Sequence, residues 1–265
     1  MAARAIWKGS LGLGRTKLPV KLYSAVEGRG LHFHLLEKKT HKRVKQHMVD
    51  ASTGDEVPRE EIRKGYEIEP DTFVLVEEDE LEKLEPEPAT DIEITGFLPE
   101  GRIGEQYFDV PYYLGPDGDA KSYFALAEAL GNKRREGFAR WVMRKKDYIG
   151  ALCARDGYLM LITLRFAEEV LTARQLGPPP GKAPDAREVK MAQQLVSVLE
   201  GEFRAEDYTD EYEEKVLKYI KAKAKGRKPK LAVLPKRRPE PKSLMAALSA
   251  SLKSVSKKEK EKAVA

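Results

Sequence analysis

Cysteine is nearly absent from this chain of 265 residues, which contains one, Cys153. A single thiol forms no internal disulfide, so the fold has to be held by packing. Long apolar runs are missing too, and the first ten residues, MAARAIWKGS, lack the apolar core of a signal peptide. We therefore expect a cytoplasmic protein with no membrane partner, in which Cys153 is buried and inert.

Metal-ligand and catalytic patterns are also lacking. Four histidines lie close together, at His32, His34, His41 and His47, but no cysteine pair or carboxylate stands beside them at ligand spacing. No serine, cysteine and histidine are spaced as in a nucleophilic triad. The chain is therefore predicted to have no metal, no cofactor and no catalytic residue.

One short motif comes close to a nucleotide-binding loop. Residues 9–16, GSLGLGRT, depart from the pattern G-x-x-x-x-G-K-[ST] at Arg15, which stands where the lysine should be. Such a loop also needs a helix after it, whereas Leu18-Pro19 and strand-like alternation follow here. The favoured interpretation is that the glycines permit bulges or tight packing in a twisted strand, and nucleotide hydrolysis is the disfavoured alternative.

The net charge of +5 hides an uneven distribution. Residues 1–66 carry 14 Lys and Arg against 7 Asp and Glu, whereas residues 67–100 carry 1 against 13. Residues 218–265 carry 16 Lys and Arg against 3 Glu. Basic charge is thus confined to one end of the body and to the tail, which favours a localised polyanion-binding surface.

Strand-like segments dominate the first two thirds of the chain. Residues 18–25, 31–36 and 91–99 have strand periodicity, and residues 107–130 predict a strand, a tight turn and a helix. Asp156-Gly157 between two apolar runs is a strong hairpin signal. The body is therefore predicted to be mainly antiparallel β.

A proline-rich linker at residues 176–185 separates this body from a segment with helical periodicity. Apolar residues recur every three or four positions from Val189 to Phe203 and again from Tyr212 to Ile220. Two amphipathic helices need an apolar surface to cover, and if the barrel leaves none open, a second subunit would supply it. The predicted dimer-contact residues are Val189, Leu195, Leu199, Phe203, Tyr212, Val216 and Ile220.

The C-terminal tail combines charge with a short apolar stripe. Residues 222–242 are basic and interrupted by prolines, so their composition predicts a disordered segment that attracts DNA. Leu244, Leu248 and Leu252 form a stripe too short to fold alone, which is expected to dock on a partner. The tail cations assigned to DNA are Lys225, Arg227, Lys228, Lys230, Lys236, Arg237 and Arg238.

A second basic region lies in the polar stretch 37–56, which predicts a long loop or ribbon projecting from the sheet. A run of charge is ordinarily a solvated surface, but this one projects and is followed by an acidic stretch that repels polyanions from the rest of the body. The assigned cations are Lys38, Lys39, Lys42, Arg43 and Lys45, followed by Arg63 and Lys64.

Ordered blocks of the sequence carry a family resemblance. They read RAIWKGSLGLGRTKLPVKLYSA (4–25), DEVPREEIRKGYE (55–67), FDVPYYLGPD (108–117), ALCARDGYLMLITLRFAEEV (151–170) and VKMAQQLVSVLEGEFRAEDYTDEYEEKV (189–216). Over nearly all of residues 1–225 the chain resembles bacterial Ku, the homodimeric DNA-end-binding protein of non-homologous end joining. The block SLMAALSASLKSV (243–255) is similar to the element with which that family engages its ligase.

The resemblance implies a mixed, mainly β fold with three parts. Residues 1–175 would form a β-barrel core with a bridge at about 28–66 that closes a dimeric ring around DNA. Residues 176–225 would form a helical dimerisation arm, and residues 226–265 a disordered basic tail with a ligase-docking helix at 243–255. The implied partners are double-stranded DNA ends, a second copy and the ATP-dependent ligase of bacterial end joining, ligase D, in the nucleoid-associated cytoplasm.

The chain departs from the family at two places. HMVD at residues 47–50 stands where many relatives carry Cys-x-x-Cys, so no metal clip is expected there. Arg15 and Lys17 stand where relatives are commonly apolar or neutral, and we add both to the predicted DNA-binding residues. The alternative function is a general nucleoid-associated protein that binds DNA through its basic tail while the body only dimerises.

Overall fold

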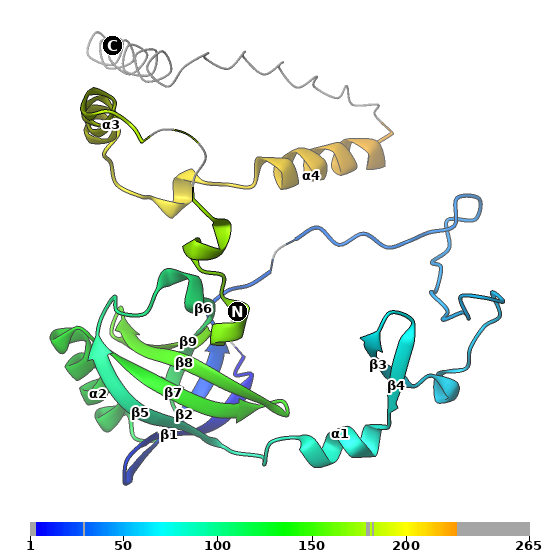
Figure 1. The fold of residues 1–265 in the computed structure, drawn as a ribbon, viewed down its shortest axis with the longest axis horizontal. Helices are drawn as coiled ribbons and strands as arrows, with labels where there is room; N and C mark the ends of the chain where they lie inside the picture. Colours follow the sequence, from blue (N-terminus) through cyan, green and yellow to red (C-terminus); the bar gives the residue numbers. More distant parts are fainter. Residues whose placement is uncertain (1–3, 29, 179–180, 182, 227–265) are drawn as a thin grey trace. The chain divides into compact units, whose positions relative to one another are not determined.

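The computed structural model describes residues 4–28, 30–178, 181 and 183–226 (Figure 1). The chain divides into two compact units, Met1–Gln175 and Leu176–Ala265. In the described ranges, no helix is long and apolar enough to cross a membrane. The predictions for Arg227, Lys228, Lys230, Lys236, Arg237, Arg238, Leu244, Leu248, Leu252 and the helix at 243–255 fall outside the described residues.

The first unit is built on a closed barrel of seven strands, in the order β1-β2-β6-β9-β8-β7-β5. The strands are β1 (Trp7–Leu13), β2 (Thr16–Ser24), β5 (Asp91–Pro99), β6 (Phe108–Pro116), β7 (Arg135–Met143), β8 (Lys146–Arg155) and β9 (Tyr158–Leu164). Six of the seven pairings are antiparallel, as the sequence predicts. β1 and β5 run parallel and close the barrel.

Strand periodicity explains the core of the barrel. In β2, Leu18, Val20 and Leu22 are buried while the residues between them are not, which is the period of two of a strand with one covered face. Leu114 and Leu161, from β6 and β9, are fully buried beside them. The described core is therefore an apolar barrel interior, which leaves function to the barrel surface and its extensions.

The parallel closure depends on Gly9. A Cβ atom there would lie 2.0 Å from the carbonyl oxygen of Thr90 and 2.1 Å from the ring of Trp7, so any larger residue would push the two strands apart. A two-residue hairpin with φ of 60° at Gly14 joins β1 to β2. Since a strand follows the glycines where a phosphate-binding loop needs a helix, the nucleotide-binding alternative is wrong.

One helix, α2 (Ala120–Lys133), packs mainly against β8. Tyr123 and Leu130 on its inner face are buried. The Tyr123 hydroxyl donates to the carbonyl oxygen of Leu114 and accepts from the N–H of Leu159 at 2.9 Å. This hydroxyl therefore ties the helix to both β6 and β9.

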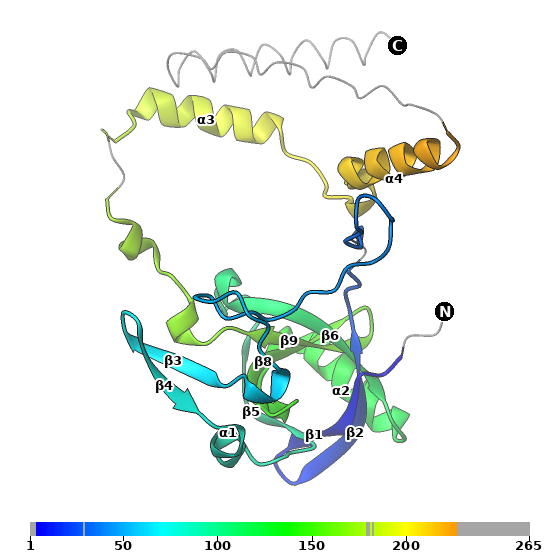
Figure 2. The same ribbon diagram turned by 90° about the vertical axis from the view of Figure 1, so that its right-hand side faces the viewer.

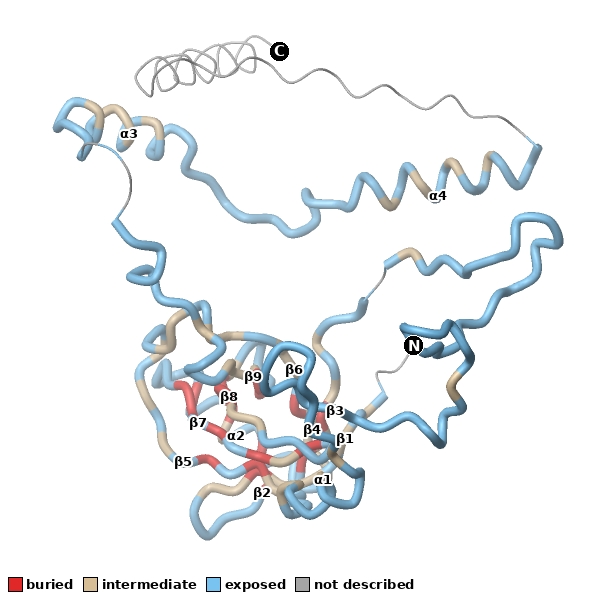
Figure 3. The backbone as a smooth tube through the Cα atoms, turned by 45° about the vertical axis from the view of Figure 1, so that its right-hand side comes forward, coloured by how far each residue is buried: buried red, intermediate tan, exposed pale blue. Residues whose placement is uncertain are grey.

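Between β2 and β5 the chain leaves the barrel for residues 25–90, which we call the excursion (Figure 2). Its regular elements are a 3-10 turn (Arg59–Glu61), β3 (Lys64–Glu69), β4 (Thr72–Val76) and α1 (Glu78–Leu84). β3 and β4 form a sheet of their own. Figure 3 shows that the excursion is almost entirely exposed. The apolar residues Tyr66, Phe73 and Leu75 within it are exposed as well.

The second unit contains two helices, α3 (Ala186–Val198) and α4 (Glu211–Ala224). Asp185 and Asp210 cap them by accepting hydrogen bonds from first-turn N–H groups. The periodicity that predicted one helix to continue to Phe203 was misleading there, because α3 ends at Val198 and Gly201 favours a break. None of the described residues of this unit is buried.

Candidate nucleic-acid interface

The basic loop of the excursion folds back on itself between Leu36 and Arg43, which form an isolated β-bridge. The Glu37 N–H donates to the carbonyl oxygen of Lys42 at 2.8 Å, and the His41 N–H donates to that of Glu37 at 2.9 Å. These bonds hold the loop backbone, so the cationic side chains on it project outward. All five predicted cations here are exposed: Lys38, Lys39, Lys42, Arg43 and Lys45.

These five cations carry uncompensated charge. None of them forms an ion pair with another described residue, whereas His47, a few residues on, contacts the Glu56 carboxylate. Surface lysines and arginines without carboxylate partners are what a phosphate backbone neutralises on binding. The structure therefore leaves this loop, which we call the basic loop (residues 37–45), available for a polyanion.

Arg63 and Lys64 are neighbours, but only Arg63 has an ion-pair partner among the described residues. The Arg63 guanidinium donates to the carbonyl oxygen of Ile62 at 3.2 Å, and its Nε lies 3.3 Å from a carboxylate oxygen of Glu77. Lys64 is exposed and takes part in no ion pair with any residue that the structure describes. Of this pair, Lys64 is the freer cation.

Arg15 and Lys17 differ in the same way. Lys17 forms an ion pair with Asp91, which also accepts from the Ser10 hydroxyl. The hydrogen bond from Lys17, and then that from Ser10, holds the pKa of the Asp91 carboxyl below its usual value. Arg15 lies exposed in the β1–β2 hairpin. Lys17 therefore helps to hold β2 against β5, and Arg15 is the more available of the two.

The returning part of the excursion is acidic, and one of its contacts with the barrel is made at the β7–β8 turn. Residues Glu78, Asp79 and Glu80 begin α1. At the other end of the helix, the Lys145 ammonium in the turn between β7 and β8 lies 3.0 Å from Glu85 and 3.8 Å from Glu82. The Glu85 carboxylate raises the pKa of Lys145.

The excursion leaves and re-enters the barrel at the same end. β2 ends at Ser24, paired with Tyr112 in the middle of β6, and β5 begins at Asp91, paired with Ser10 in the middle of β1. The end of β7 and the start of β8 lie at this same end of the barrel, which we call the rim.

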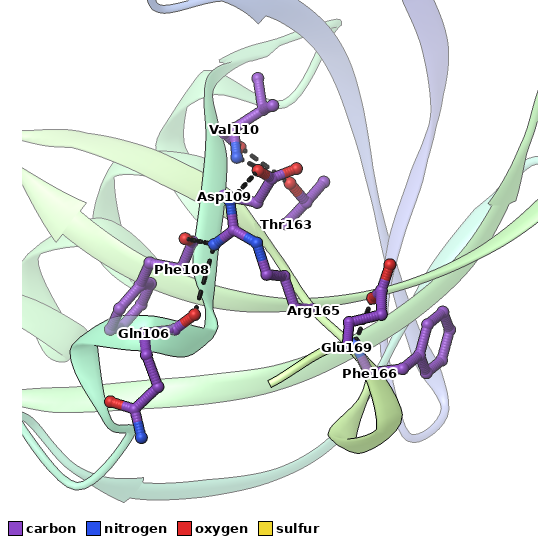
Figure 4. Close-up of polar contacts among 8 residues, drawn as sticks. All are labelled: Gln106, Phe108, Asp109, Val110, Thr163, Arg165, Phe166 and Glu169. Carbon is purple, nitrogen blue, oxygen red and sulfur yellow. Dashed lines mark hydrogen bonds and ion pairs between the residues drawn. The ribbon is translucent and has the colours of Figure 1, made fainter. Parts of the chain in front are cut away.

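Arg165 fixes this rim, as Figure 4 shows. Its guanidinium donates to the carbonyl oxygens of Phe108 and Gln106, the latter at 3.3 Å, and to the Asp109 carboxylate at 2.6 Å. The backbone N–H of Arg165 donates to the carbonyl oxygen of Tyr107 at 2.8 Å. Because these donors all bind residues 106–109, at and just before the start of β6, Arg165 stabilises the fold there and is not a free cation.

The sequence reasoning missed three consecutive cations on this rim. Arg144, Lys145 and Lys146 are exposed at the β7–β8 turn. The signal was present, because RKK stands between the apolar runs FARWVM and YIGALC, as a hairpin turn would.

Apolar residues of the second unit lie open, as an interface would require. Val189, Ala192 and Val196 line a shallow groove along α3. Phe203 and Tyr208 stack on each other with ring centroids 5.3 Å apart, and both are exposed. Within the described part of the chain, nothing in the second unit covers these side chains.

Comparison with known proteins agrees with this architecture. The family of the Ku70/Ku80 beta-barrel domain matches residues 13–194. A "Non-homologous end joining protein Ku" of Coxiella burnetii is 39% identical over 230 residues, covering 85% of this chain and 84% of its own.

Similar proteins occur in distant organisms. "Non-homologous end joining protein Ku 2" of Geotalea uraniireducens is 36% identical, covering 96% of this chain and all of its own. The protein of the same family name from Archaeoglobus fulgidus is 34% identical, with 95% and 99% covered. The barrel, its match and these relatives together show that this chain belongs to the Ku family.

Proposed function

We propose that this protein binds double-strand DNA ends in non-homologous end joining, as a homodimeric ring without enzymatic activity. The observation that carries the proposal is the excursion, which leaves one end of a closed barrel and presents a loop of uncompensated cations. The names of the relatives supply the biological process.

Exposed apolar side chains of the excursion support the proposal of a dimeric ring. β3 and β4 expose Tyr66, Phe73 and Leu75, and a two-stranded sheet by itself is only marginally stable. A second copy would cover this surface by two-fold symmetry, with the same patch on both subunits. The residues assigned to the bridge, 28–66, would then close around the duplex together with their symmetry mates.

The helices of the second unit would strengthen the dimer. Val189, Leu195, Val216 and Ile220 provide apolar faces, and Leu199, Phe203 and Tyr212 extend them. Burying such side chains on a partner would contribute about 25 cal/mol per Å² of apolar surface.

DNA recognition by this ring is proposed to be independent of sequence. Cations on a loop contact phosphates, which are the same at every base pair. Affinity should fall steeply with salt because each contact releases a bound counterion. The assigned contacts are Lys38, Lys39, Lys42, Arg43, Lys45 and Lys64, together with Arg63 and with Arg15 and Lys17 at the β1–β2 hairpin.

The C-terminal segment is proposed to recruit the ligase. Leu244, Leu248 and Leu252 would dock on an ATP-dependent end-joining ligase, while Lys225 and the cations that follow it add contacts to DNA. Changing these three leucines to Asp should abolish stimulation of the ligase and leave DNA binding intact. Unchanged stimulation would overturn the docking assignment.

The full-length protein on one plasmid, linearised or covalently closed, provides the test of end binding. A threading ring binds the linear form at salt concentrations where the closed form is free. Equal binding of both forms at every salt concentration would contradict the ring.

A general nucleoid-associated protein acting through its tail is the second candidate. It is favoured by the charge layout, because the tail from residue 218 carries 16 cations against 3 Glu. Replacing the tail cations by Gln in the full chain separates the two functions: the second candidate loses all DNA binding, whereas an end-binding ring keeps its preference for linear DNA.

A further inference from the structure

The β7–β8 turn has an unusual sequence for its backbone. Two residues, Arg144 and Lys145, connect the paired residues Met143 and Lys146. Their φ angles are 52° and 64°, so both lie in the left-handed region. Two-residue hairpins of this kind prefer Asn-Gly or Asp-Gly, because other side chains are strained there.

The next hairpin of the same barrel follows the preference. Asp156 and Gly157 join β8 to β9 with φ angles of 52° and 79°. Barrel closure therefore does not require two long cations at such a turn. Strain that the fold does not need often accompanies function, and here it presents Arg144, Lys145 and Lys146 to solvent.

The turn lies at the root of the excursion, whose basic loop contacts DNA under the proposed function. β7 pairs with β5 so that Arg140 stands opposite Glu93, which brings the end of β7 level with the point where the excursion returns. Lys145, Met143 and Glu85 line one groove together with Trp7. In Figure 1 the hairpin ends beside α1, at the root of the excursion.

The three cations are not equivalent. Lys145 contacts Glu85 and Glu82, while Arg144 and Lys146 form no ion pair within the described residues. The contacts of Lys145 are solvent-exposed, and exposed ion pairs of this kind are weak. A phosphate that reached the groove could therefore take the place of the glutamates.

We propose that the β7–β8 turn is a phosphate-binding element of the barrel rim, in which Arg144 and Lys146 contact the DNA backbone directly and Lys145 exchanges Glu82 and Glu85 for a phosphate when DNA binds. This inference rests on the proposed function. It adds a DNA contact outside the basic loop and a reason for the acidic anchor of the returning excursion.

The first experiment measures the salt dependence of binding to linear and to covalently closed duplex, for wild type and for the variant Arg144→Gln with Lys146→Gln. Two lost phosphate contacts reduce the slope of log K against log salt by roughly 1.8. An unchanged slope would overturn the direct contacts. If wild type itself shows no preference for linear DNA, the proposed function fails instead, so the two failures are distinguishable.

The exchange of partners is tested by a double-mutant cycle between Glu85 and Lys145. Glu85→Gln is expected to tighten DNA binding severalfold in wild type and to have no effect in the Lys145→Gln background. Glu87→Gln removes the same charge from the same groove without contacting Lys145. If Glu87→Gln tightens binding as much as Glu85→Gln, general repulsion explains the effect and the exchange is wrong.

The strained turn allows one more test, with a variant that is expected to be more stable than wild type, so that a loss of DNA binding would not reflect a loss of folding. Arg144→Asn with Lys145→Gly installs the preferred turn residues and is expected to raise the melting temperature while weakening DNA binding. A variant with unchanged affinity would show that the cations at this turn serve no DNA contact.

Discussion

The barrel and the excursion belong to one unit but differ in how they place apolar side chains. The barrel buries Leu114, Leu161 and their neighbours completely, whereas the excursion leaves Tyr66, Phe73 and Leu75 open to solvent. The same unit thus packs a tight apolar core and still leaves other apolar side chains exposed, so their exposure does not reflect a poorly formed core. The excursion is therefore best understood as a surface built for other molecules.

The two regions also treat charge differently. On the barrel, Lys21 lies 2.5 Å from Asp117, and Glu100 binds both Arg134 and Arg155. These hydrogen bonds hold the pKa of Glu100 below its usual value. In the basic loop the cations have no described partner. The paired charges help to hold the barrel, whereas the unpaired cations of the basic loop are open to a polyanion.

The largest effect should come from cutting into the barrel. Leu161→Ala removes a side chain with 0% exposure and is expected to lower the free energy of unfolding by about 2–5 kcal/mol. Leu75→Ala, at 65% exposure in β4, is the matched variant and should change it by less than about 0.5 kcal/mol in the monomer. Denaturant unfolding followed by the fluorescence of the buried Trp141 measures both, and equal losses would erase the comparison.

Neutralising the basic loop should break function and leave the fold. The triple change of Lys38, Lys42 and Arg43 to Gln removes up to three phosphate contacts, so the salt slope should fall by roughly 2.7 and affinity by on the order of a hundredfold near 0.1 M salt. The melting temperature should stay the same, since none of the three is paired with a described residue.

A matched control for the loop is available on the other surfaces of the barrel. Arg102, Lys121 and Lys133 are exposed cations, and their replacement by Gln removes the same total charge. If this control lowers the salt slope as much as the loop variant, net charge rather than the loop determines binding.

Much of the barrel could be predicted from the sequence, and the reasons are local. Alternation in β2 and the Asp156-Gly157 turn each specify structure within a few residues. The parallel pairing of β1 with β5 could not be predicted, because it joins Ser10 to Asp91 across the whole excursion. The end of α3 was misplaced because apolar spacing continued past Val198 after the backbone had left the helix.

The candidate site was predictable in the same partial way. A run of cations is visible in sequence, so a projecting basic segment could be predicted, and its binding of DNA stays a prediction. Pairing is not visible, because Arg63 reaches Glu77 and Lys17 reaches Asp91 only in three dimensions. The β7–β8 cations were overlooked because three charges in a turn resemble any solvated hairpin until the left-handed φ angles of Arg144 and Lys145 are known.

A smaller loss is expected from a single hydroxyl inside the barrel unit. Tyr123→Phe leaves the N–H of Leu159 and the carbonyl oxygen of Leu114 without this partner in a site with 0% exposure. Unfolding free energy should fall by about 1–3 kcal/mol. Tyr158→Phe, whose ring is half exposed, is the control and should be nearly neutral. Equal effects of the two changes would mean that the hydroxyl of Tyr123 does not tie α2 to the barrel.

The smallest expected effect concerns Glu136, a buried charge of the barrel that lacks an ion-pair partner in the described part of the chain and so differs from the paired barrel charges above. Glu136 is 5% exposed, one of its carboxylate oxygens has no hydrogen-bond partner among the described residues, and the Glu100 carboxylate is near. Burial first, and then Glu100, raises the pKa of Glu136 above its usual value.

A raised pKa means that the folded protein holds this proton more tightly than the unfolded chain, so ionisation of Glu136 destabilises the fold as pH rises. Glu136→Gln should therefore gain stability relative to wild type with increasing pH. The difference is smallest below about pH 4, the usual pKa of a glutamate in the unfolded chain, and grows as pH rises through the raised pKa of Glu136 in the folded protein. Urea unfolding across that range measures it, with the exposed Glu128→Gln as control. A difference that stays flat or shrinks with pH would show that the barrel accommodates the Glu136 charge as readily as water does.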